Sequence, residues 1–289
     1  MNSTEGGRSG LVNLGNTCFM NTCIQCMFHL PGFNEFITNT RFTEKEQRLL
    51  FNTKKLLKGL WENDCTVSPV TFHKLIKELA KKESNDNFSQ NNQNDLQEFI
   101  IFLLDKYEQE SSEYFKQNFT GKMKTKLFNN ETDKQISSSE YEYTILPVPV
   151  IENGTLDECI EEYLSPEILE DDNQYFDEKS GEYIDVRREL DIESVPDNLI
   201  ISLNRFRNDG RKITGIVDIP MELIIHAKVY SLVGIGNHTG DRFGGHYYAF
   251  ALHGNNWYTF NDSGVQSIDT ENIVKNTAYV LFYSLKTSE

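Results

Sequence analysis

The chain has 289 residues, which is enough for one large domain or two, and its hydrophobic content of 38% is sufficient for a sizeable core. The 28 basic and 44 acidic residues give a formal net charge of −16, which argues against nucleic acid or an anionic membrane as a partner and favours basic partners, although solubility alone explains most charge of this kind. Five cysteines suit a reducing compartment better than a disulfide framework. Because no apolar run resembles a signal peptide or a membrane span, we expect an intracellular protein of the cytoplasm, the nucleus or both.

The N-terminal stretch contains the most informative cysteine. Residues 1–9 are rich in serine and glycine, so we expect a flexible N-terminus. Residues 10–31 form a polar, glycine-bearing loop followed by a predicted amphipathic helix, which Pro31 and Gly32 end. Cys18 stands in the first turn of that helix, where the helix dipole and unpaired N–H groups favour an anion. Its thiol is therefore expected to ionise more readily than that of a free cysteine, as a nucleophile requires.

Two asparagines precede this cysteine in the same loop. The side-chain amides of Asn13 and Asn16, together with nearby backbone N–H groups, are suited to hold the oxyanion that forms when a thiolate attacks a carbonyl. Cys18 is therefore a candidate nucleophile. A buried structural cysteine is the alternative, and this stretch taken alone favours it, because most free cysteines are inert core residues.

The residues that follow predict core helices. Apolar residues recur at helical spacing in three runs, which cover residues 49–60, 69–79 and 96–107. The polar stretch 81–92 is predicted to be a loop without stable packing. Asp95 forms a capping pair with Glu98 at the start of the third helix, and on physical grounds alone we interpret it as a helix cap.

From about residue 119 the sequence changes to short β-rich runs broken by polar turns. One short helix is predicted around residues 155–163, and a glycine-rich turn around 234–245. Helices in the first part of the chain and strands in the second predict an α+β fold. The predicted strands are 141–150, 199–206, 217–220, 229–233, the hairpin of 246–250 with 257–260, and 279–285.

A histidine opens the predicted hairpin, and the partner strand ends in Asn261 and Asp262. In that geometry His246 is placed to accept the proton of Cys18 and later to donate one to the leaving amine. Asn261 would accept from the other ring nitrogen and so hold the tautomer, with Asp262 as the reserve for this orienting role. Without its context, His246 is better explained as a strand-edge histidine. The remaining histidines have no ligand spacing and are interpreted as surface or core residues.

Three motifs, in order along the chain, resemble those of one protein family. The cysteine box of the ubiquitin-specific proteases is similar, at nearly every position, to Gly10-Leu-Val-Asn-Leu-Gly-Asn-Thr-Cys-Phe-Met-Asn21. Their second box resembles Gln93-Asn-Asp-Leu-Gln-Glu-Phe99. Their histidine box resembles Gly244-Gly-His-Tyr-Tyr-Ala-Phe250, followed by Trp257-Tyr-Thr-Phe-Asn-Asp-Ser-Gly-Val265. A further strand element resembles Leu199-Ile-Ile-Ser-Leu-Asn-Arg-Phe206.

The resemblance implies a papain-like cysteine protease of α+β class. A single catalytic domain would span residues 10–289, with a helical thumb at about 10–117, β-stranded fingers at about 118–195 and a β-rich palm at about 196–289. The implied reaction is thiol-dependent hydrolysis of the amide or isopeptide bond after the C-terminal glycine of ubiquitin, through a cysteine thioester. It implies ubiquitin and ubiquitin conjugates as partners, a monomeric enzyme and no cofactor. A protease for another ubiquitin-like modifier and a catalytically silent ubiquitin-binding module are the alternatives.

The same resemblance implies residues that contact the substrate. In the family, the positions of Gln93, Asp95 and Gln97 line the channel for the extended C-terminal tail of ubiquitin, which carries arginines. Asp95 would then have a cationic partner as well as a capping role. Around the catalytic histidine, the residues expected at the substrate are Gly244, Gly245 and Tyr247.

The finger segment departs from the family pattern. Most members hold the finger tips with two Cys-x-x-Cys pairs on one zinc ion. Residues 126–139 contain no cysteine, residues 175–179 occupy the place of the second pair, and Cys159 lies on the predicted helix. We therefore expect fingers that lack a zinc site, in which packing and strand pairing supply the stability that the metal contributes elsewhere.

Overall fold

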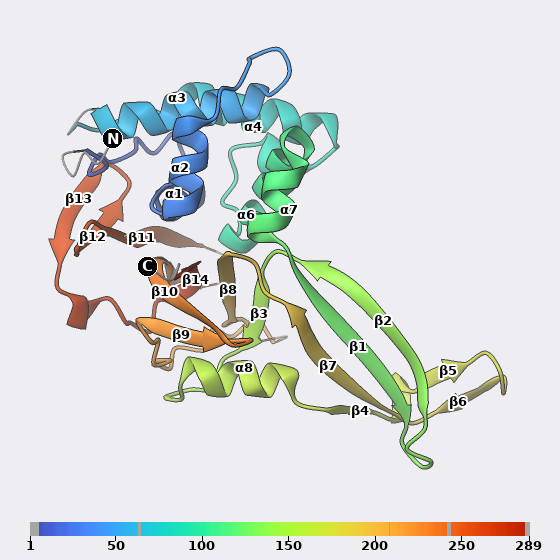
Figure 1. Cartoon of the computed structure of the whole chain (residues 1–289). Coiled ribbons are helices and arrows are strands. Elements are labelled where there is room, and N and C mark those ends of the chain that lie inside the picture. Colours follow the sequence, from blue (N-terminus) through green and yellow to red (C-terminus); the bar gives the residue numbers. More distant parts are fainter. Residues whose placement is uncertain (1–5, 63–64, 208, 242–243, 287–289) are drawn as a thin grey trace.

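The computed structural model describes residues 6–62, 65–207, 209–241 and 244–286. Figure 1 shows the helices of residues 18–119 gathered at one end of the molecule, a β-sheet beside them, and a long β-ribbon that extends away from both. These parts correspond to the predicted thumb, palm and fingers, and the fold is α+β. None of the helices in the described ranges is long and apolar enough to cross a membrane.

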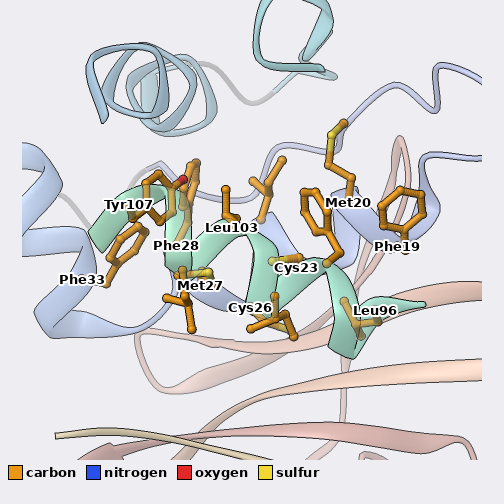
Figure 2. Packing of buried hydrophobic residues seen from close by; sticks show 14 of the residues in the cluster. Phe19, Met20, Cys23, Cys26, Met27, Phe28, Phe33, Leu96, Leu103 and Tyr107 are labelled. Carbon is orange, nitrogen blue, oxygen red and sulfur yellow. The ribbon is translucent and has the colours of Figure 1, made fainter. Parts of the chain in front are cut away.

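Helix α1 is the centre of the thumb. All of its 11 residues are buried, because α6 covers it on one side and the palm sheet on the other. Figure 2 shows side chains of both helices, among them Cys23 and Leu103, in one apolar core. The predicted amphipathic helix thus has no solvent face of its own. The thumb helices are α1 Cys18–Phe28, α2 Pro31–Asn39, α3 Arg48–Glu62, α4 Val70–Lys82, α5 Asp86–Ser89, α6 Leu96–Glu110 and α7 Ser112–Phe119.

One expectation about the thumb needs correction. The stretch 81–92, predicted as a loop without stable packing, contains the short helix α5. Its Phe88 is buried against the rings of Phe19 and Phe99, with centroids 6.1 and 5.4 Å away. An aromatic side chain buries enough apolar area to fix a short polar segment onto the core, so composition alone was misleading here.

The palm is an eight-stranded sheet in the order β13-β12-β11-β10-β14-β8-β3, with β9 paired to β10. Its strand pairs are antiparallel except for β3 and β8, which run parallel. The inner strands β8 and β14 carry almost continuous buried apolar runs, as expected for strands covered on both faces. The strands are β3 Leu146–Pro149, β8 Asn198–Asn204, β9 Glu222–Ile225, β10 Lys228–Gly240, β11 Gly245–His253, β12 Asn256–Asn261, β13 Gly264–Ile268 and β14 Ala278–Leu285.

Two predictions in the palm were wrong. Residues 217–220 do not form a strand, since Asp218 makes only an isolated bridge with Thr155. The glycine-rich stretch 234–245 is mostly strand rather than turn, because β10 continues to Gly240. Its glycines serve close packing: a Cβ atom at Gly236 would lie 2.5 Å from Leu96 Cδ2 on α6.

The fingers consist of a four-stranded antiparallel sheet, β2-β1-β7-β4, and a separate β5–β6 hairpin. Their predicted range of 118–195 needs correction, because β3 and α8 lie inside it and belong to the palm. The chain leaves the fingers after β2 and returns to them at β4 (Figure 1). The elements are β1 Gly121–Asn129, β2 Gln135–Tyr143, α8 Leu156–Leu164, β4 Glu167–Leu169, β5 Tyr175–Asp177, β6 Glu182–Ile184 and β7 Val186–Ser194.

Polar contacts join the ends of the finger strands. Arg187 on β7 donates to Asp133 at 2.7 Å, and its guanidinium lies 5.0 Å from the centre of the Phe128 ring. Asn129 Oδ1 accepts from the backbone N–H of Thr132 at 2.8 Å, which shapes the β1–β2 turn. The described parts of the chain contain no group of three or more His, Cys, Asp or Glu side chains arranged to hold a metal ion.

Residues 6–9 pack against the thumb, in contrast to the flexible N-terminus expected for residues 1–9. The backbone N–H of Gly7 donates to the carbonyl of Leu60 at 3.2 Å, and Gln25 Nε2 donates to the carbonyl of Ser9 at 2.9 Å. This short segment is therefore fixed to α3 and α1. Residues 1–5, the rest of that prediction, lie outside the described residues.

Candidate active site

A cavity of about 730 Å³ lies between the thumb and the palm. Helices α1 and α6 provide one wall, and strands β10, β11 and β14 provide much of the other. Clefts of this size between packed units are common places for ligand sites. Of the predicted site residues, those that line it are Cys18, Gln93, Asp95, Gln97, Gly244, Gly245 and Tyr247.

Cys18 is the first residue of α1, and only 5% of its surface is exposed. Its pKa is raised, because burial disfavours the charged thiolate and the nearby charge of Asp262 adds to this effect. A hydrogen bond from the backbone of Tyr247 opposes the shift without reversing it. The expectation that this thiol ionises more readily than a free cysteine was therefore wrong for the unliganded protein, since burial outweighs the backbone hydrogen bonds that favour the thiolate.

His246 and Asn261 are joined by a hydrogen bond of 2.6 Å between the ring Nε2 and the amide Oδ1. The antiparallel register of β11 and β12, with Ala249 opposite Phe260, brings the start of one strand beside the end of the other. Because an amide oxygen only accepts, Nε2 carries the proton and Nδ1 is the basic nitrogen. No hydrogen bond within the described ranges joins the Cys18 thiol to this ring.

Asp262, the reserve orienter, contacts asparagines of the cysteine box instead. Its carboxylate accepts from Asn13 Nδ2 at 3.0 Å and from Asn21 Nδ2 at 2.8 Å. Its backbone lies in the left-handed region, with φ of +49°, where the chain turns between β12 and β13. Asp262 thus holds the loop before Cys18, whereas Asn261 holds the histidine ring.

The two candidate oxyanion donors are held differently. Asn13 Oδ1 accepts from the backbone N–H of Thr17 at 3.1 Å, which fixes the orientation of its amide. Its Nδ2 carries two hydrogens and can therefore serve Asp262 and an oxyanion at the same time. Asn16 Nδ2 donates to the carbonyl of Asn91 at 3.0 Å and so ties the loop to the segment before α6. Each amide therefore keeps one N–H hydrogen for a further acceptor, and Asn13 is the one joined to Asp262.

Asp95 caps α6, as predicted. Its Oδ1 accepts from the backbone N–H groups of Gln97 and Glu98 at 2.7 and 3.1 Å. Its Oδ2 accepts from the hydroxyls of Tyr279 and Tyr247 at 2.7 and 3.2 Å. The carboxylate therefore links the thumb to the palm across the cleft and is fixed in place before any substrate binds.

Gln93 makes a second link across the same cleft. Its Oε1 accepts from the backbone N–H of Gly245 at 3.3 Å. Gln97 and Gly244 line the cavity on the thumb and palm sides. The residues predicted to contact the substrate thus face one space, although they come from opposite halves of the chain.

Sequence reasoning missed several residues that line the cavity. Phe206 ends the strand that resembles an element of the protease family, and Tyr279 begins the last predicted strand. Both lay in recognised apolar runs, which we interpreted only as core packing. His238 also lines the cavity, and its position in the sequence gave no reason to separate it from the other histidines.

A family model described as ubiquitin carboxyl-terminal hydrolase matches residues 9–283. The chain belongs to the ubiquitin carboxyl-terminal hydrolase family. Ubiquitin carboxyl-terminal hydrolase Usp2 of Drosophila melanogaster is 27% identical to it over 330 residues, which cover 96% of this chain and 35% of that protein. Ubiquitin carboxyl-terminal hydrolase 2 of Bos taurus is 27% identical over 349 residues, which cover 99% of this chain and 56% of that protein. The chain thus spans about a third to just over half the length of these relatives.

A solved structure shares the fold of this ubiquitin carboxyl-terminal hydrolase. The SAGA DUB module Ubp8/Sgf11/Sus1/Sgf73 bound to monoubiquitin matches with a TM-score of 0.80 and 24% sequence identity. The match covers 100% of this chain and 71% of the other chain. The membership and fold that the sequence motifs predicted are therefore confirmed.

Proposed function

We propose that this ubiquitin carboxyl-terminal hydrolase is a thiol-dependent deubiquitinase, which hydrolyses the amide or isopeptide bond after the C-terminal glycine of ubiquitin. One observation carries the proposal: Cys18 lines the cleft from α1, and the hydrogen-bonded pair of His246 and Asn261 lies at the start of β11, a strand of the opposite wall, and at the end of its neighbour β12. The names of the relatives and the monoubiquitin bound to the solved neighbour support the same substrate.

The reaction follows from the positions of these groups. His246 Nδ1 takes the proton of Cys18 Sγ, and the sulfur attacks the carbonyl carbon of the terminal glycine. Asn13 donates to the oxyanion of the tetrahedral intermediate. The imidazolium then gives its proton to the leaving amine, and a thioester remains. Water, deprotonated by the same ring, attacks the thioester, and the carboxylate product and the free thiol are released.

Because the thiol is buried and neutral, the histidine must remove its proton before the sulfur can attack. Because the pKa of Cys18 is raised in the unliganded protein, the thiolate is scarce until the base is in contact. We therefore expect substrate binding to bring the sulfur and the ring together, with Asn261 keeping the ring in the tautomer that accepts a proton.

The tail of ubiquitin would occupy the cleft. Asp95 offers an acidic group to a tail arginine, although two tyrosine hydroxyls already occupy one of its oxygens. The partners we propose are ubiquitin and its conjugates, bound by a monomeric, cofactor-free enzyme of the cytoplasm or nucleus. The other residues proposed to contact the tail are Gln93, Gln97, Tyr247, Gly244 and Gly245.

Turnover of a reporter amide at the C-terminus of ubiquitin tests the proposal. The parent protein should release the reporter, and Cys18→Ser and His246→Ala should lose turnover but keep ubiquitin binding, because the binding surface is much wider than the two side chains. Hydrolysis by the Cys18→Ser protein would refute the assignment of the nucleophile. If the parent protein binds ubiquitin without turnover, it is a catalytically silent binding module. If it reacts faster with reporters of another ubiquitin-like modifier, that modifier and not ubiquitin is its substrate.

A further inference from the structure

Lys212 lies outside the three motifs, in the segment between β8 and β9, and reaches the end of β10. Its Nζ lies 3.0 Å from His238 Nδ1 and donates to the carbonyls of His238 and Gly240 at 2.7 and 3.3 Å. The ring of Phe206 covers the ammonium, with its centre 5.9 Å from Nζ. The three N–H groups of the ammonium are therefore all directed at the last residues of one strand.

The contact with Lys212 fixes the tautomer of His238. An ammonium has no lone pair, so Nδ1 must be the acceptor and the ring proton lies on Nε2. Burial lowers the pKa of His238 to about 4, and the charge of Lys212 acts in the same direction, against Asp95 and Asp241, which raise it. The ring is thus a neutral, oriented group at pH 7, and 4% of the residue surface is exposed.

The other edge of this ring lies against the start of β11. A Cβ atom at Gly245 would lie 2.1 Å from His238 Nε2, so the ring packs directly on the backbone of this glycine. Gly245 is the residue before His246, and Thr239 Oγ1 donates to the carbonyl of His246 at 3.3 Å. The His246 backbone thus follows directly on the residue that packs against the His238 ring, and it pairs with Thr239 on the same strand as that ring.

We propose that Lys212 is a positioning residue for the catalytic histidine. By holding the ring of His238 against Gly245, it sets the start of β11 and hence the point from which His246 reaches Cys18. The inference rests on the proposed function, because its kinetic consequence requires that His246 act as the base. Misplacement of a reacting group by about 1 Å can lower the rate of the chemical step by about a hundred-fold.

Lys212→Met tests this, because it removes the charge and the donors and keeps the aliphatic stem. The matched control is Lys228→Met: Lys228 begins the same strand and donates to the carbonyl of Val195 at 3.2 Å, away from the cleft. We expect kcat of Lys212→Met to fall by roughly ten- to a hundred-fold, with KM within about twofold of the parent. Lys228→Met should stay within about twofold in both. Equal kcat values for the two variants would overturn the proposal.

A spectroscopic measurement tests the same idea without substrate. In protein labelled with ¹⁵N-histidine, the ring nitrogens of the six histidines report their tautomers. The parent and Lys228→Met should show His238 protonated at Nε2, and Lys212→Met should change both the His238 and His246 signals. A parent ring protonated at Nδ1, or unchanged His246 signals in Lys212→Met, would contradict the inference even if the parent had no activity on ubiquitin.

A double-mutant cycle separates positioning from general loss of stability. His238→Asn retains an acceptor near the Nδ1 position but loses the ring edge that packs on Gly245. If Lys212 acts through His238, adding Lys212→Met to His238→Asn should lower kcat by less than about twofold more. Fully additive losses would show that Lys212 acts by another route. Should Lys212→Met fail to fold, Lys212→Arg, which keeps the charge, enters the same cycle.

Discussion

The carboxylate of Asp262 accepts a hydrogen bond of 3.0 Å from Asn13, which lies 249 positions earlier in the chain. Its neighbour Asn261 accepts from the ring of His246 instead. Two adjacent residues thus contact different parts of the site: Asn261 orients the proposed base, and Asp262 fixes the loop that carries the proposed oxyanion donor. Asp262 has a left-handed backbone and stands in the turn between β12 and β13, directly after the end of the strand that carries Asn261.

Variants of these neighbours should therefore behave differently. We predict that Asn261→Ala lowers kcat by less than Cys18→Ser does, because water can replace an orienting amide in part. Asn13→Ala and Asp262→Ala should be strongly non-additive, since the two side chains contact, whereas Asn13→Ala and Asn261→Ala should be close to additive. Steady-state kinetics of the single and double variants measure this. Additive losses for Asn13 and Asp262 would show that their hydrogen bond has no part in turnover.

The raised pKa of Cys18 predicts slow modification of the free enzyme. A neutral alkylating reagent reacts with thiolates, so burial should make Cys18 react at least about tenfold more slowly than the exposed Cys65 at pH 7.5. The rate at Cys18 should continue to rise from pH 7 to 9, because a thiol with a raised pKa is still mostly protonated in this range and gains thiolate as the pH rises. Mass spectrometry of the digested protein follows both sites in one sample. A plateau of the Cys18 rate below pH 7 would show instead a thiolate held by an ion pair.

Asp95 should matter for stability as well as for the substrate. Asp95→Asn keeps an oxygen for the helix cap. It replaces the other oxygen, which accepts from both tyrosine hydroxyls, with an NH₂ group that can only donate. We predict a free energy of unfolding lower by roughly 1–3 kcal/mol, measured by urea denaturation, and a smaller loss when Tyr279→Phe is already present.

The proposed contact of Asp95 with a tail arginine has a separate test. Ubiquitin with each tail arginine replaced by alanine should lose less turnover with Asp95→Asn than with the parent. If neither arginine replacement is less harmful to the variant, Asp95 acts only as a cap and as the link between thumb and palm.

The close approach of α6 to β10 predicts an unusual sensitivity at Gly236. Gly236→Ala would place a methyl group 2.5 Å from Leu96 Cδ2, and we expect the free energy of unfolding to fall by roughly 1–3 kcal/mol. Gly32→Ala is the matched control, since nothing lies within 4 Å of its Cβ position and it stands in helix α2. This control should be neutral or slightly stabilising. Equal urea midpoints for the two variants would mean that Leu96 moves aside at no cost.

Metal removal tests the expectation of zinc-free fingers. Because the finger ends are joined by contacts such as Arg187 with Asp133, a chelator should change neither the melting temperature nor reporter turnover. Elemental analysis of the purified protein should find far less than one zinc per chain. Stoichiometric zinc, or a lower melting temperature in chelator, would contradict the prediction.

The motifs predicted much of the site because their residues determine local structure and chemistry together. Asp95 is an example: an acidic residue before an apolar helical run caps that helix wherever the helix packs, so its position and its main contacts followed from the sequence. His246 and Asn261 likewise followed from a hairpin whose register places them near each other.

The errors came from long-range packing. The ionisation of Cys18 was predicted from its place on the helix, but its pKa depends on burial by the palm, which the local sequence does not contain. The glycines around Gly236 suggested a turn. The sequence does not distinguish a glycine that leaves room for a neighbouring helix from one that allows the positive φ of a turn. Lys212 has no motif and acquires its contacts only when two distant segments meet.

The path of the chain through the fingers has a consequence for how the protein unfolds and how it can be altered. Since β3 and α8 return to the palm between β2 and β4, neither part is a continuous piece of sequence, and neither can be cut out as an independent unit. Loss of the palm strands should therefore release the fingers in the same cooperative transition. The β5–β6 hairpin differs, because its strands pair only with each other within the described chain, so additional residues inserted at its turn would separate no other strands.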